Sequence, residues 1–255
     1  MSELIFREKL LEVRALLGRK YQPYARLLPE SCRPEADWLN MELLPGLVLL
    51  PVVFGEGENP NIGRLAGAME LSFLAGRIHD LAMLEDGMLA RSILCGDYLY
   101  AAAGLLLSGA GYEGWLGRVG KVLCRRSEGK IGELGWAGRA YIPPTERVAA
   151  LHKQNGEGFA LAAEMAVEGL HGDLDTWPEF GYYVGILQGM ALQGLTGEAY
   201  SKEYGQALEQ AVSALAGLPR ELALAAREHI LRGLGLHQLE NGFSAYPEKV
   251  YSGIL

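Results

Sequence analysis

The chain has 255 residues, of which 49% are hydrophobic and 21% are charged, a composition typical of a folded globular protein. Its 23 basic and 31 acidic residues leave a net charge of −8, and no basic stripe runs along the chain, so we expect no nucleic-acid partner. The longest apolar stretch, residues 43–54, is shorter than the roughly 20 residues of a membrane span. We find no secretory signal, and the three widely spaced cysteines fit neither a disulfide framework nor a zinc site. We therefore expect a cytoplasmic protein without a transmembrane segment.

Apolar residues recur at helical spacing through the first third of the chain. A first amphipathic helix is expected to end at Gly18, and a proline-rich connection follows it up to residue 34. The next apolar segment carries Pro45 and Pro51, which predict a break in any helix formed there. A long helix is then expected over residues 62–86.

Helical spacing continues through the rest of the chain, where no alternating strand pattern stands out. The adjacent Pro143 and Pro144 mark the start of one of these helices. Further helices are expected over residues 98–107, 112–139, 145–170, 176–194, 198–216 and 219–235. Residues 236–255 read as a tail. The sequence predicts one all-α domain over residues 1–255, with eight or more helices.

Four short fragments follow one another in a distinctive order within these expected helices. They are residues 68–80 ending in His79-Asp80, then Gly96-Asp97-Tyr98-Leu99, then Gly132-Glu133, and finally Phe180-Gly181 with Val184-Gly185. In this order and spacing they resemble the trans-polyprenyl diphosphate synthases. The resemblance covers about residues 40–200 and implies an all-α isoprenoid synthase-type bundle around a central cavity.

That family condenses an allylic diphosphate with isopentenyl diphosphate, and magnesium ions held by two Asp-Asp-x-x-Asp motifs neutralise the leaving diphosphate. If Asp80 is the first aspartate, Leu81 and Leu84 stand where the next two are expected, and neither can bind magnesium. His79 is interpreted as a packed remnant of the motif. The nearby Glu85 and Asp86 come too late in the helix to replace them, although a displaced site made with Asp80 is an alternative.

The second motif is missing altogether. Counting from Phe180-Gly181, its three aspartates are expected at positions that hold Leu192, Gln193 and Thr196. Residues 180–197 contain no carboxylate, so a small shift of the alignment does not restore one. Half of the magnesium cage that the family needs is therefore absent from this sequence.

The basic residues that bind diphosphate in the family are also missing. Its glycine-rich basic motif is expected near residues 43–52, which contain no Lys or Arg. Its arginine pair meets Leu89-Ala90, with a lone Arg91 one step later, and its Lys-Thr pair meets Asn155-Gly156. The connection over residues 81–95 is shorter than the family's phosphate-binding loop.

The chain is therefore most similar to the non-catalytic small subunit of heterodimeric heptaprenyl or hexaprenyl diphosphate synthases, which make the side chain of menaquinone. This resemblance implies a catalytic large subunit as partner, with magnesium on that partner and no cofactor on this chain. The small subunit is expected to act through dimerisation and control of product length, with the apolar isoprenoid chain as a further contact. Self-association into a homodimer without the partner is a second arrangement that the resemblance allows.

The helix over residues 98–108 is the candidate dimer interface. Its small residues permit close approach of another backbone, and its leucines supply apolar surface; the candidate positions are Tyr98, Ala101, Ala102, Gly104 and Leu105. Ordinary packing within one chain explains the same pattern equally well. Two other functions stay open at this point: an active prenyltransferase with a rebuilt magnesium site, and a stand-alone isoprenoid-binding protein.

Overall fold

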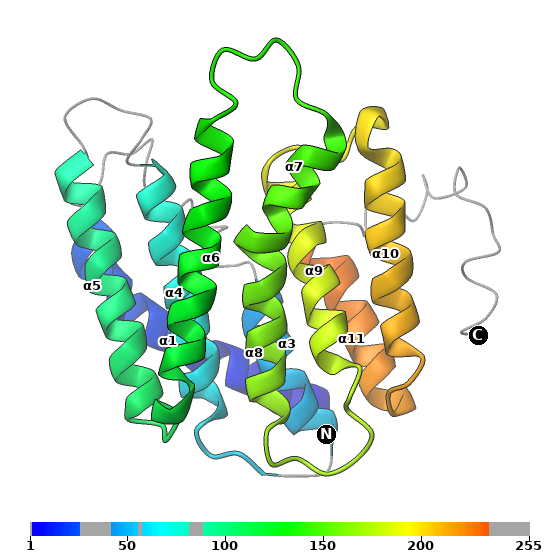
Figure 1. The fold of residues 1–255 in the computed structure, drawn as a ribbon. Coiled ribbons are helices and arrows are strands. Elements are labelled where there is room, and N and C mark those ends of the chain that lie inside the picture. Colours follow the sequence, from blue (N-terminus) through cyan, green and yellow to red (C-terminus); the bar gives the residue numbers. More distant parts are fainter. Residues whose placement is uncertain (1, 26–41, 56–57, 82–88, 235–255) are drawn as a thin grey trace. The chain divides into compact units, whose positions relative to one another are not determined.

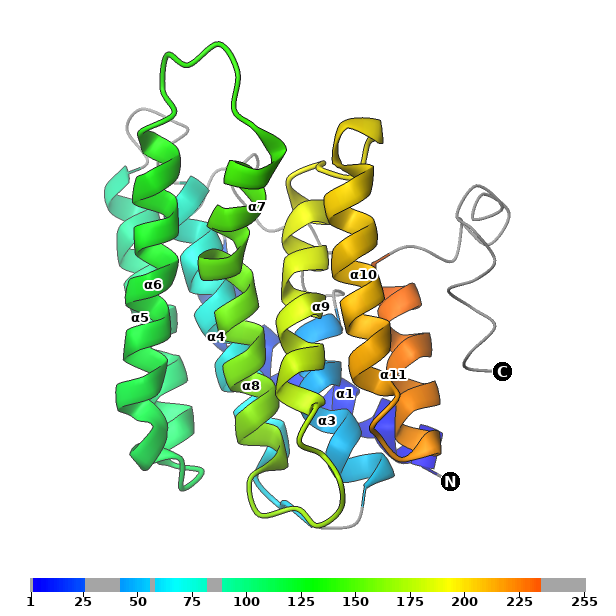
Figure 2. The same ribbon diagram turned by 45° about the vertical axis from the view of Figure 1, so that its right-hand side comes forward.

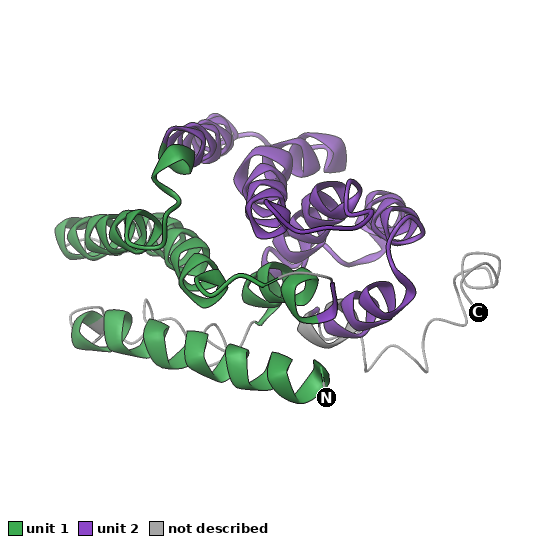
Figure 3. Cartoon of the chain, turned by 90° about the horizontal axis from the view of Figure 1, so that it is seen from below, with its two compact units in different colours: residues 1–53, 58–116 green, residues 54–57, 117–255 purple. Residues whose placement is uncertain are grey.

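The structure is a computed structural model, and it describes residues 2–25, 42–55, 58–81 and 89–234. These residues form helices, and no β-strand occurs among them (Figure 1). They cluster into two compact units (Figure 3). That the two units make up one domain stays a prediction.

Unit 1 consists of residues 1–53 and 58–116. Its helices are α1 (Ser2–Ala25), α3 (Leu43–Phe54), α4 (Ile62–Leu81) and α5 (Leu89–Ser108). The predicted stop at Gly18 is wrong, because α1 continues for another seven residues to Ala25. Leu17 and Tyr21 are both buried on the core face of α1, and that burial outweighs the cost of about 1 kcal/mol for a glycine inside a helix.

The two prolines of α3 do not interrupt it. Pro45 lies in the first turn, where its missing N–H has no partner within a helix in any case. Pro51 lies in the last turn, so only one hydrogen bond near the end of the helix is lost. Residues 43–51 are all buried. Among the helices that the structure describes, none is long and apolar enough to cross a membrane.

Unit 2 consists of residues 54–57 and 117–255. Its elements, given with their bounds, are α6 (Leu116–Leu134), α7 (Pro144–Leu151), the π-helical turn η3 (His152–Gly156), α8 (Glu157–Val167), α9 (Trp177–Leu192), η4 (Glu198–Tyr200), α10 (Ser201–Leu215) and α11 (Arg220–Gly233). The elements α7, η3 and α8 form one uninterrupted helical run. It ends within three residues of the end predicted from the sequence.

The core of unit 2 is built around α9, which lies between α8 and α10 (Figures 1 and 2). Trp177 and Phe180 of α9 are fully buried, as is Phe159 of α8. A Cβ atom built on Gly185 of α9 would lie 2.8 Å from both the backbone oxygen of Asn155 and the Cβ of Phe159. Because only glycine fits at this distance, Gly185 allows α9 to pack directly against the backbone of η3.

Candidate functional site

His79 lies in the last turn of α4 and contacts α5 of the same unit. Its Nε2 is 3.1 Å from the backbone oxygen of Ile93 and 3.3 Å from a carboxylate oxygen of Asp97. Because a carbonyl only accepts hydrogen bonds, Nε2 donates its proton to Ile93. The imidazole also meets the ring of Tyr100 edge-on, with 5.4 Å between centroids. His79 therefore ties the end of α4 to α5.

Gly96 explains how the imidazole comes so close to α5. A Cβ atom on Gly96 would lie 2.2 Å from both Cδ2 and Nε2 of His79, and 3.1 Å from the backbone oxygen of Ala75. No larger residue fits without moving the ring. Two of the sequence fragments that carry the family resemblance, His79-Asp80 and Gly96-Asp97, thus meet in space in a contact between helices.

The other positions of the first motif are only partly described. Asp80 is half-buried near the end of α4, Leu81 is its last residue, and Arg91 is exposed in the first turn of α5. Leu84, Glu85 and Asp86 lie outside the described residues. Within the described part of the chain, no group of three or more His, Cys, Asp or Glu side chains could hold a metal ion. The displaced site of Asp80, Glu85 and Asp86 stays a prediction.

The three positions of the second motif lie at the end of α9. Leu192 is the last residue of the helix and is 39% exposed, and Gln193 and Thr196 follow it in an exposed turn. An alkyl group, an amide and a hydroxyl carry no negative charge at neutral pH. Magnesium prefers carboxylate oxygens, so these residues do not fit the ion that the sequence resemblance predicts at this place.

The carboxylate of Glu133 does lie next to Gln193, but it already forms an ion pair with Lys130. The amide of Gln193 donates to Oε1 of Glu133 on α6 at 3.5 Å, the outer limit of a hydrogen bond. Nζ of Lys130 lies 2.9 Å from Oε2 of the same carboxylate. Lys130 therefore neutralises Glu133, and the pair holds the end of α9 to the end of α6.

At the position predicted for the Lys-Thr pair, Asn155 and Gly156 make uncharged packing contacts. Asn155 and Gly156 belong to η3, and a Cβ atom on Gly156 would lie 2.9 Å from the ring of Tyr182. The buried amide of Asn155 lies 3.0 Å from a Cβ position on Gly189. A π-helical turn often marks a functional site. Here Asn155 and Gly156 pack against α9 and carry no charge, and the cation of the turn, Lys153, lies next to Glu128.

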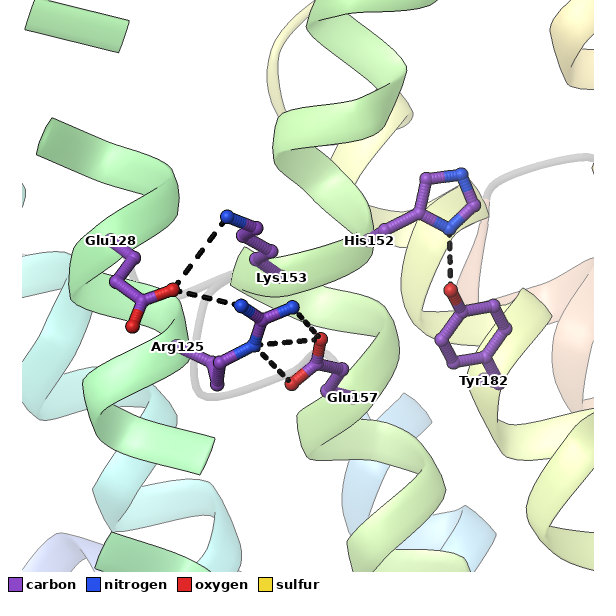
Figure 4. Close-up of polar contacts among 6 residues, drawn as sticks. All are labelled: Arg125, Glu128, His152, Lys153, Glu157 and Tyr182. Carbon is purple, nitrogen blue, oxygen red and sulfur yellow. Dashed lines mark hydrogen bonds and ion pairs between the residues drawn. The ribbon is translucent and has the colours of Figure 1, made fainter. Parts of the chain in front are cut away.

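The basic residues near this turn are paired with carboxylates (Figure 4). Arg125 of α6 lies 2.9 Å from Glu128 and 3.2 Å from Glu157, and Nζ of Lys153 lies 3.6 Å from Glu128. The hydrogen bond to Glu157 is the main reason that the pKa of Arg125 is raised. A diphosphate at this place would have to displace acidic side chains from both cations.

A histidine and a tyrosine form a separate contact beside this cluster. Nδ1 of His152 is 2.6 Å from the hydroxyl of Tyr182 on α9 (Figure 4). Burial lowers the pKa of His152, so the imidazole is neutral at pH 7. Burial also raises the pKa of Tyr182, and the phenol keeps its proton. The sequence offered no signal for this pair, because the two residues are far apart along the chain.

The candidate interface residues of α5 divide between two faces. Ala102 is buried in unit 1, and the ring of Tyr98 lies 4.1 Å from that of Tyr24 on α1. Gly104 is half-buried, whereas Ala101 and Leu105 are exposed. Leu94, which is 68% exposed, continues the exposed side at helical spacing. We call Leu94, Ala101 and Leu105 the α5 face. Leu94 lies seven residues before Ala101, and Ala101 lies four before Leu105. This helical spacing could have predicted from the sequence that Leu94 shares their face.

Comparisons with known proteins agree with this architecture. A scan against protein-family models and a sequence search of curated proteins found no match. Among solved structures, a geranylgeranyl pyrophosphate synthase from Corynebacterium glutamicum, complexed with calcium and isoprenyl diphosphate, has a TM-score of 0.65 at 19% identity, covering 92% of this chain and 96% of that one. A decaprenyl diphosphate synthase from Rhodobacter capsulatus has a TM-score of 0.63 at 17% identity, covering 92% and 99%.

A third similar structure is the small subunit of a geranyl diphosphate synthase from Antirrhinum majus. Its TM-score is 0.58 at 19% identity, covering 87% of this chain and 98% of that one. The predicted fold class is confirmed by these likenesses, and the central cavity stays a prediction. The chain has the all-α fold of the isoprenoid diphosphate synthases.

Proposed function

We propose that this chain is a non-catalytic subunit of a polyprenyl diphosphate synthase and that it acts by binding a catalytic subunit. The observation that carries the proposal is the end of α9, where Leu192, Gln193 and Thr196 occupy the positions predicted for the second aspartate motif and none of them is a carboxylate. Without carboxylates there, the chain lacks half of the cage that holds magnesium on a leaving diphosphate.

The surroundings of the lost motif support the same proposal. Lys130 neutralises Glu133, and Arg125 and Lys153 are paired with Glu157 and Glu128. A diphosphate would therefore have to compete with these carboxylates for each cation. A solved structure of the same fold is itself a synthase small subunit. The same fold therefore also occurs in a protein named as the small subunit of a synthase.

In this proposal the catalytic subunit holds the magnesium and both aspartate motifs, and the two chains form a heterodimer. The α5 face is the proposed contact, because Leu94 and Leu105 expose apolar surface on one side of a helix. Apolar side chains of this chain would then help to set the length of the isoprenoid product. The proposed setting is the cytoplasm, and the proposed product is the menaquinone side chain.

The test is a reconstitution with a catalytic chain that has both motifs intact. The purified chain alone, given magnesium, farnesyl diphosphate and isopentenyl diphosphate, should form no product. Mixing it with the catalytic chain should produce activity, or change the product length that the catalytic chain makes alone. Sustained turnover by the chain alone would contradict the proposal and favour a rebuilt magnesium site.

A pair of matched variants tests the contact. Leu105→Glu on the α5 face should abolish co-purification with the catalytic chain, because a carboxylate would be buried at the interface. Leu224→Glu on α11 changes another exposed leucine and should leave co-purification intact. If both variants bind as well as the parent chain, the α5 face is not the contact. If no catalytic chain binds at all, a stand-alone isoprenoid-binding protein becomes the better explanation.

A further inference from the structure

The end of α6 and the connection to α7 expose three large apolar side chains. We call residues 131–143 the α6–α7 tip. Ile131 is 67% exposed, Leu134 is 54% exposed and Tyr141 is 69% exposed. Figures 1 and 2 show the connection extending beyond the ends of α9 and α10 of the same unit. Monomeric soluble proteins seldom gather large apolar side chains on one projection unless it contacts something.

The charged side chains of the tip form ion pairs with other residues of the chain. Arg139 makes a two-pronged ion pair with Glu146, with distances of 2.6 and 3.0 Å. That hydrogen-bonded pair raises the pKa of Arg139 and lowers the pKa of Glu146. Glu133 is paired with Lys130. The tip therefore presents no unpaired charge, although the whole chain has a net charge of −8.

The tip also has a defined shape. Gly138 adopts a φ of +81°, a conformation that favours glycine and turns the chain. Ile142 is 8% exposed and anchors the returning segment, and α7 begins at Pro144. The guanidinium of Arg147 lies over the ring of Trp136, 5.8 Å from its centroid. These features give the backbone of the connection a defined path, so less of it has to be ordered on binding.

We propose that the α6–α7 tip docks on the surface of a zwitterionic lipid bilayer. Leu134 and Ile131 would enter the boundary between headgroups and acyl chains, with Trp136 and Tyr141 at the level of the headgroups, where amphipathic rings are favoured. The net charge of −8 opposes binding to anionic lipids, so the attraction is apolar and the headgroups are neutral overall. The inference does not depend on the proposed function.

The form of the tip favours a bilayer over a protein partner. A specific protein interface buries about 800 Å² on each side, arranged as an apolar patch inside a polar rim with satisfied hydrogen bonds. The tip is a narrow projection whose ionic groups are already paired with each other. A bilayer accepts such a projection without a complementary pocket, because its surface deforms around the inserted side chains.

The first experiment is co-sedimentation of the full chain with phosphatidylcholine vesicles. The parent chain should sediment with the vesicles, and the double variant Leu134→Glu with Tyr141→Glu should lower its apparent affinity by at least roughly tenfold. Leu224→Glu, an exposed leucine on α11 of the same unit, is the matched control and should bind like the parent chain. Raising the fraction of phosphatidylserine should weaken binding. Circular dichroism verifies that each variant is folded.

The second experiment locates the contact. Lipids brominated near the headgroup should quench part of the tryptophan fluorescence of the parent chain, and Trp136→Phe should remove that part. The proposal is overturned if the parent chain does not bind phosphatidylcholine vesicles, or if the double variant binds them equally well. It is also overturned if the double variant changes only the oligomeric state in light scattering, since the tip would then be a contact between protein chains.

Discussion

The two places where the sequence resemblance predicts metal motifs differ in what they keep. At the end of α4 in unit 1, His79 is present and contacts Ile93, Asp97 and the backbone at Gly96. At the end of α9 in unit 2, Leu192 and Gln193 stand where the resemblance predicts metal-binding aspartates. The end of α4 keeps His79, which packs against α5. The end of α9 keeps none of the carboxylates that metal binding would need. Packing and chemistry are therefore separable requirements on the same fold.

Each unit also has a glycine that lets two helices pack closely, and the two glycines differ in what a new side chain would meet. At Gly185 on α9 the obstacles are the backbone oxygen of Asn155 and the Cβ of Phe159, which cannot move without shifting a helix. At Gly96 on α5 the nearest obstacle is the ring of His79, which can rotate. We therefore expect the contact in unit 2 to tolerate substitution less well than the contact in unit 1.

The largest effect is expected from Gly185→Ala. The added methyl group overlaps backbone and Cβ atoms, so the free energy of unfolding should fall by about 3 kcal/mol, measured by denaturant titration. Gly120→Ala on α6 is the control, because nothing lies within 4 Å of its Cβ position. It should raise stability by up to about 1 kcal/mol through helix propensity. Equal effects of the two variants would show that α9 and η3 are not packed this closely.

Gly96→Ala should have the next largest effect. The methyl group displaces the imidazole of His79 and breaks its hydrogen bond to Ile93, so we expect a loss of about 2 kcal/mol in the free energy of unfolding. Gly104→Ala in the same helix meets nothing within 4 Å and should be neutral or slightly stabilising. The double variant of His79→Ala with Gly96→Ala should lose less than the sum of the two single variants. Additive losses would mean that the two residues do not touch.

These two contacts mark the limit of what the sequence predicts. Helical periodicity and the Pro143-Pro144 pair predicted the run from α7 to α8, and residue identity alone predicted that Leu192, Gln193 and Thr196 cannot bind magnesium. The contact of Gln193 with Glu133 joins residues 60 positions apart, so no local pattern contains it. The glycine contacts and the π-helical turn likewise depend on how two helices align, which periodicity leaves open. The continuation of α1 through Gly18 is decided by tertiary burial for the same reason.

The two units also hold titrating groups whose pKa values are shifted in opposite directions. Burial raises the pKa of Glu70 on α4 from 4.5 to about 7. Below pH 4.5 Glu70 is protonated in both the folded and the unfolded chain, so unit 1 has its full stability. This stability falls as the pH rises through 7, because the buried carboxyl group then loses its proton. Glu70→Gln should raise the free energy of unfolding at pH 8 by about 1 kcal/mol and leave it unchanged at pH 4.5. The full pKa shift corresponds to a larger free-energy change, but the side chain of Glu70 is partly exposed and water screens its charge. Equal differences at both pH values would exclude titration of Glu70 as the cause.

The smallest effect is expected from His152 in unit 2, and its sign is opposite. Burial lowers the pKa of His152 below 6.5, so the folded chain holds a neutral imidazole where the unfolded chain takes up a proton. Stability is therefore full above pH 6.5 and falls as the pH drops below it. His152→Gln should flatten this dependence in denaturant titrations between pH 7.5 and 5.5. Tyr182→Phe removes the hydrogen bond but keeps the imidazole buried, so it should lower stability at every pH while the slope persists. A slope that disappears in Tyr182→Phe as well would mean that the hydrogen bond, and not burial, sets the pKa of His152.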